Sequence, residues 1–132
     1  MKYLYIFILM CLSQQVYAQN ILAYSHSQNH GIILTQEYFG GDQHSFTPSK
    51  TDLDAIEELL STLNIDFSGY VRQYYGETIP SRTCIYVQLI PMEFVKKYYP
   101  DWKEGLITVF DNTSIKYFSY DLKTKKLSQW YR

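Results

Sequence analysis

The residue types that most often carry chemistry are sparse in this chain. Of its three histidines, His26 and His30 have the spacing that would place two metal ligands on one face of a helix. Their neighbours are Ser, Gln, Asn and Gly, which do not favour a helix, so no metal site is predicted. His44 could activate Cys84 as a nucleophile. However, Cys84 lies in an apolar β-rich run, where a buried and unreactive thiol is expected.

The carboxylates do not define a reaction either. Asp52, Asp54, Glu57 and Glu58 crowd the beginning of an expected helix, where the helix dipole favours negative charge. The glycine-rich motifs that hold nucleotides are absent. We therefore expect no catalytic residue, no metal and no cofactor, and a protein that is not an enzyme.

Aromatic residues are the most distinctive feature, with Tyr 14, Phe 7 and Trp 2 in 132 residues. Many fall on expected strands, whose side chains alternate between two faces, so they cannot all face a covering helix. Tyr and Trp on the uncovered face would suit contact with a partner. We expect Tyr74, Tyr86 and Trp130 to form such a binding surface. The alternative is that aromatic pairs across strands only stiffen the sheet.

Residues 1–18 have the pattern of a cleavable secretory signal. Lys2 precedes an apolar run at residues 3–12, and a more polar stretch ends at Ala18. The run is about half of the ~20 residues that a helix needs to cross a membrane, so no stable membrane span is expected. A lipid anchor at Cys11 is the second form of export that the sequence leaves open, although a bulky residue precedes that cysteine.

Without this signal the chain keeps 114 residues, with 11 basic and 13 acidic side chains. This near balance argues against a nucleic-acid partner, which requires a dense basic face. Cys84 would be the one remaining cysteine, which excludes an internal disulfide.

The rest of the chain is expected to form a mobile leader over residues 19–30 and a single domain over residues 31–132. An apolar stripe that includes Leu53, Ile56 and Leu60 predicts an amphipathic helix of roughly 14 residues. A second, short helix is expected over residues 92–99. Period-2 patterns and turn residues predict the strands, at residues 31–39, 69–76, 82–90, 106–110, 115–122 and 127–131. The expected class is α+β, with one long helix on a curved antiparallel sheet of four to six strands.

This layout resembles an uncharacterised family of small exported Bacteroidota-type proteins. The resemblance rests on the order of the helix, the strand with Arg72-Gln73-Tyr74 and the segment Pro100–Glu104. It implies a two-layer topology similar to the cystatin-like and NTF2-like folds, and it implies no activity. The Gln-x-Val-x-Gly hairpin of inhibitory cystatins is absent, so protease inhibition by that route is not expected.

The sequence thus favours an exported, non-enzymatic binding module, periplasmic, secreted or on the cell surface. Its partner would be a protein, a peptide or a glycan held on the open aromatic face. A pocket protein with a small apolar ligand between helix and sheet, and weak hydrolase or isomerase activity, is the alternative. A third reading is a structural subunit of a surface assembly.

Overall fold

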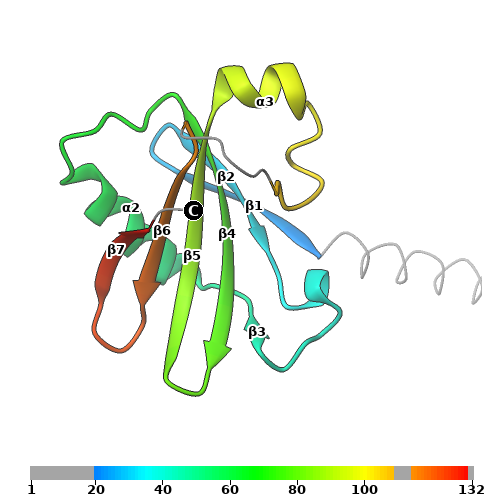
Figure 1. The fold of residues 1–132 in the computed structure, drawn as a ribbon, viewed down its shortest axis with the longest axis vertical. Helices are drawn as coiled ribbons and strands as arrows, with labels where there is room; N and C mark the ends of the chain where they lie inside the picture. Colours follow the sequence, from blue (N-terminus) through cyan, green and yellow to red (C-terminus); the bar gives the residue numbers. More distant parts are fainter. Residues whose placement is uncertain (1–19, 109–113, 131–132) are drawn as a thin grey trace, which may run out of the picture.

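A computed structural model describes residues 20–108 and 114–130 of the chain. The expected signal at residues 1–18, with Cys11, lies outside these residues. Within them the chain forms one sheet of seven strands (Figure 1). The elements in chain order are β1 (Ile21–His26), β2 (Asn29–Leu34), the 3-10 helix η1 (Glu37–Phe39), β3 (Ser45–Phe46), α2 (Lys50–Ser61), β4 (Tyr70–Ile79), β5 (Arg82–Pro91), α3 (Met92–Tyr98), β6 (Lys116–Asp121) and β7 (Lys126–Trp130).

The sheet is mixed, with the order β1-β2-β4-β5-β6-β7, and β3 adds to β4. β2 and β4 pair in parallel, while every other pair of neighbouring strands is antiparallel. A parallel pair needs a crossover connection, and α2 lies on that connection between β2 and β4. The expected hairpin of β4 and β5 is confirmed, with ten paired positions from Tyr70↔Pro91 to Ile79↔Arg82.

Helix α2 begins after the N-cap Ser49, whose hydroxyl accepts a hydrogen bond from the Asp52 amide at 3.2 Å. Its apolar stripe, Leu53, Ile56 and Leu60, is buried as the spacing predicts. The helix packs on what we call the inner face of the sheet. The core residues there come from β2, β4, β5 and β6 and include Ile33, Tyr74, Ile85, Val87, Leu89 and Phe118.

The opposite face, here called the outer face, is also partly covered. Part of this face is covered by α3 and by the segment that follows it, through Val95, Trp102 and Ile107. The strand residues beneath them are Ile32, Leu34, Val71 and Ile90. The sheet therefore lies between α2 on one side and α3 with residues 99–108 on the other.

The expected fold class is wrong. The sheet has seven strands and a parallel pair, the longer helix has only 12 residues, and the outer face is partly covered. An open two-layer, cystatin-like or NTF2-like arrangement of one long helix on an antiparallel sheet is therefore overturned. The sheet is mixed because the connection through α2 returns the chain so that β4 runs beside β2 in the same direction.

Most of residues 20–30, which were expected to belong to a mobile leader, lie in strands of the sheet. Ile21–His26 and Asn29–Leu34 form a hairpin that turns at Ser27, which has a positive φ of 56°. The polar residues that suggested an irregular leader lie at the end of β1, in the turn at residues 27–28 and at the start of β2.

Candidate functional site

Two of the three expected binding residues lie together, and the third lies elsewhere. Tyr86 on β5 and Trp130 on β7 are half-buried on the outer face, with ring centroids 6.1 Å apart. Tyr74 is fully buried on the inner face, where its hydroxyl donates to Glu57 Oε2 at 3.0 Å. Its neighbour Tyr75 takes the place expected for Tyr74, since Tyr75 is the residue that pairs with Tyr86.

Five aromatic side chains from η1 and four strands form what we call the aromatic row of the outer face. Its members are Phe39, Tyr75, Tyr86, Trp130 and Tyr117. Tyr75 and Tyr86 stack at 5.2 Å, and the tryptophan ring meets Tyr86 edge-on and Tyr117 at 5.0 Å. Contacts of this kind rigidify the row, because each ring limits the rotation of the next.

The strands that carry the row also place small and charged side chains beside it. Ser119 is the cross-strand partner of Tyr86, and Ser128 is the partner of Ser119. Two residues farther along each strand, Asp121 pairs with Lys126. Because side chains alternate, these residues share the outer face with the row.

The charges on this part of the face balance. Glu77 and Asp121 are acidic, while Arg82 and Lys126 are basic. Burial, followed by the charge of Glu77, raises the pKa of Tyr86, so its hydroxyl stays protonated at neutral pH and can donate a hydrogen bond. The surface can therefore offer donors, acceptors and aromatic carbon without a net charge.

Two buried glutamines fasten the segment that follows α3 to the outer face. Gln73 Nε2 donates to the carbonyl oxygens of Trp102 and Gly105, both at 2.8 Å. Its Oε1 accepts from the Ile107 amide at 2.9 Å and from Gln88 Nε2 at 2.6 Å. The expected strand at residues 106–110 is absent from its described part, because side chains rather than a neighbouring strand satisfy this backbone.

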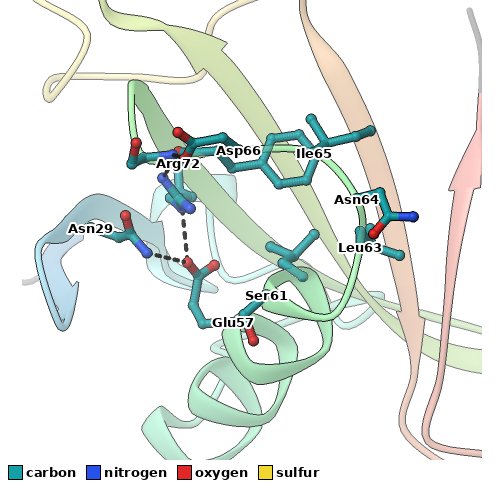
Figure 2. A pocket seen from close by; sticks show the side chains of 11 residues that line it. Asn29, Glu57, Ser61, Leu63, Asn64, Ile65, Asp66 and Arg72 are labelled. Carbon is teal, nitrogen blue, oxygen red and sulfur yellow. Dashed lines mark hydrogen bonds and ion pairs between the residues drawn. The ribbon is translucent and has the colours of Figure 1, made fainter.

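The inner face holds a buried polar network that the sequence reasoning missed (Figure 2). Arg72 Nε and Glu57 Oε1 form an ion pair at 2.9 Å, and both side chains are 2% or less exposed. Asn29 Nδ2 also reaches Glu57 Oε1, at 3.4 Å. A signal was present, because Glu57 lies four residues after Leu53 and three before Leu60, which puts it near the buried stripe.

The other polar candidates do not assemble into a site. His26 and His30 lie on neighbouring strands rather than on one helix, and His30 Nδ1 is 3.1 Å from Ser25 Oγ. Among residues 20–108 and 114–130, no group of three or more His, Cys, Asp or Glu is arranged to hold a metal. Cys84 is buried, and burial raises the pKa of its thiol, which disfavours the nucleophilic thiolate.

No family model matches the chain, and no curated protein or solved structure is significantly similar to it. In the part of the chain that the structure describes, no helix is long and apolar enough to cross a membrane.

Proposed function

We propose that this protein is an exported binding module that holds a neutral glycan on the aromatic row of its outer face. The observation that carries the proposal is the contact chain of Tyr75, Tyr86 and Trp130. These half-buried side chains come from three different strands. Export is part of the proposal because of the signal pattern at residues 1–18.

The chemistry of a sugar ring suits this surface. One side of the ring presents C–H groups, which pack on aromatic rings, while its edge presents hydroxyl groups that both donate and accept hydrogen bonds. The polar side chains beside the row can form hydrogen bonds with those hydroxyls; they are Ser119, Ser128, Asp121 and Arg82. A neutral partner is favoured because two acidic and two basic side chains balance on this face.

Intrinsic fluorescence can test this proposal directly. The chain has two tryptophans, so Trp102→Phe leaves Trp130 as the one reporter. We expect neutral oligosaccharides, tested as a panel of maltohexaose, cellohexaose, laminarihexaose and chitohexaose, to change the Trp130 emission for at least one member. A response to extended peptides alone, with no response to any sugar, would identify a peptide-binding face and overturn the glycan proposal.

A matched pair of tyrosine variants distinguishes specific binding at the aromatic row from non-specific adsorption to exposed aromatic side chains. Tyr86→Ala should weaken binding at least tenfold, since truncating a central aromatic contact of an interface costs about 2 kcal/mol or more. Tyr98→Ala is the control, because Tyr98 is 57% exposed on α3 and does not belong to the row. Equal losses in both variants would contradict a site at the row.

A further inference from the structure

A second surface, independent of the outer face, has the character of a ligand site. A cleft of about 450 Å³ lies at the C-terminal end of α2, beneath the segment that leads to β4 (Figure 2). This volume falls within the range of small-molecule sites. The lining is polar at the Arg72–Glu57 end, where Asn29 also lies, and elsewhere includes Leu63 and Ile65.

The guanidinium of Arg72 is only partly used by the protein. Its Nε donates to Glu57, and its Nη1 donates to the carbonyl oxygens of Phe67 at 2.9 Å and Tyr70 at 2.6 Å. Its Nη2 makes no hydrogen bond to any residue of the described ranges. Among the described residues, Nη2 is not one of the fully buried side-chain atoms that lack a partner, so it remains within reach of solvent. A guanidinium has five N–H donors, and those of Nη2 are therefore available to an acceptor oxygen at the Arg72 end of the cleft.

The charges around the cleft decide what kind of oxygen that is. Glu57 already neutralises Arg72, and the carboxylate of Asp66 lines the same cleft. Hydrogen bonds from Ser68 lower the pKa of Asp66, so this carboxylate is ionised at neutral pH. The lining is thus net negative. A carboxylate or phosphate ligand would be repelled, whereas the uncharged oxygen of an amide would not.

The apolar part of the cleft suits a ligand that has a hydrocarbon portion. Leu63 and Ile65 are 37% and 43% exposed and are two of the four large apolar side chains in the described residues with such exposure. Both line this cleft, together with Leu60 and Phe67. Covering them would remove apolar surface from water, which favours binding.

We propose that this cleft binds a small uncharged amide, whose carbonyl oxygen accepts from Arg72 Nη2 and whose apolar body packs on Leu63 and Ile65. The amide N–H faces the acceptors of the lining, among them Asp66. Neither Arg72 nor the cleft belongs to the aromatic row, so this proposal is independent of the proposed glycan surface and is tested separately.

Three probes of equal chain length test the head group: hexanamide, hexanoate and hexylamine. Each is titrated into the ¹⁵N-labelled protein at pH 7, and the backbone amide shifts of residues 60–72 are followed. We expect hexanamide to bind with a dissociation constant at least fivefold lower than those of the two charged probes. Tighter binding of hexanoate would make this an anion site, and tighter binding of hexylamine would make it a cation site; either overturns the proposal.

Variants at the rim locate the binding without disturbing the buried pair. Ile65→Asn should weaken hexanamide binding about fivefold. This corresponds to about 1 kcal/mol, which is roughly the contribution of one buried methylene group. Leu22→Asn is the matched control, since Leu22 is 39% exposed on β1 and is absent from the lining, and it should leave binding unchanged. Equal binding by the Ile65 variant and the wild type would overturn the proposal.

Discussion

Arg72 on β4 and Glu57 on α2 form a buried ion pair that joins the crossover helix to the sheet, with Nε and Oε1 2.9 Å apart. Glu57 accepts on its other oxygen from the Tyr74 hydroxyl, and Arg72 also binds two backbone carbonyl oxygens. Taking two charges out of water is costly, and the cost is offset only when both are well hydrogen-bonded. The pair therefore fixes where α2 sits on the inner face.

Breaking the pair from one side should destabilise the fold strongly. Glu57→Gln leaves the buried Arg72 charge without its counter-ion, and we expect a loss of about 3 kcal/mol or more. The double variant Glu57→Leu with Arg72→Leu removes both charges and should recover most of that loss. Urea denaturation followed by circular dichroism measures both. A double variant less stable than Glu57→Gln would contradict this account.

A surface ion pair on the same helix is the control. Lys50 Nζ lies 3.9 Å from Asp54 Oδ2, and the Lys50 side chain is 78% exposed. Exposed pairs contribute about 0–1 kcal/mol, so Lys50→Ala should change the free energy of unfolding by no more than that.

The buried tyrosine beside Glu57 makes stability fall at alkaline pH. Burial, followed by the negative charge of Glu57, holds the pKa of Tyr74 well above its usual value. In the unfolded chain Tyr74 ionises near pH 10, while in the folded protein it keeps its proton. Its stabilising contribution is therefore complete below pH 10 and is lost as the pH rises further, at about 1.4 kcal/mol per pH unit.

Tyr74→Phe isolates this effect. The free energy of unfolding from urea curves between pH 8 and 11 should fall less steeply in the variant than in the wild type. Some slope will remain, because burial and the hydrogen bond to Asp54 also raise the pKa of Tyr24. Parallel curves for the two proteins would show that Tyr74 ionises equally in both states.

Local signals in the sequence predicted the elements better than their arrangement. The stripe of Leu53, Ile56 and Leu60 predicted α2, and the alternation at residues 82–90 predicted β5 and its hairpin with β4. The parallel pairing of β2 with β4 depends on where the crossover packs, which no local pattern records. The β1–β2 hairpin was missed because the polar run of residues 25–30, which contains its turn, was interpreted as an irregular leader.

The candidate surface was predicted in part for a related reason. Tyr74 and Tyr75 are adjacent, so one of them must face inward and one outward. The register Tyr75↔Tyr86 decides which, and that register is a tertiary property. The meeting of Tyr86 with Trp130 likewise depends on β6 separating their strands, and the use of Gln73 and Gln88 on a backbone segment has no sequence signal.

Removing Gln73 should release the segment after α3 from the outer face. Gln73→Leu deprives the carbonyl oxygens of Trp102 and Gly105 and the amide of Ile107 of a partner. Buried polar groups left unpaired cost about 1–3 kcal/mol each, so a loss of at least 3 kcal/mol is expected. Hydrogen exchange should also accelerate at Ile107. Gln129→Leu, at a half-buried glutamine on β7, should change stability by only about 0.5 kcal/mol.

The parallel contact of β2 with β4 requires a glycine at position 31. A Cβ there would lie 2.8 Å from Arg72 Cβ, from the Arg72 carbonyl oxygen and from a ring carbon of Tyr74. Gly31→Ala should therefore cost about 1–3 kcal/mol, as overpacking does elsewhere, and should disturb the Arg72–Glu57 pair. Gly69→Ala is the matched control, because nothing lies within 4 Å of the added Cβ. Urea denaturation and the shift of the Arg72 Nε–H resonance report both effects. Equal stability of the two variants would mean that β2 and β4 do not approach each other as closely as the structure has them.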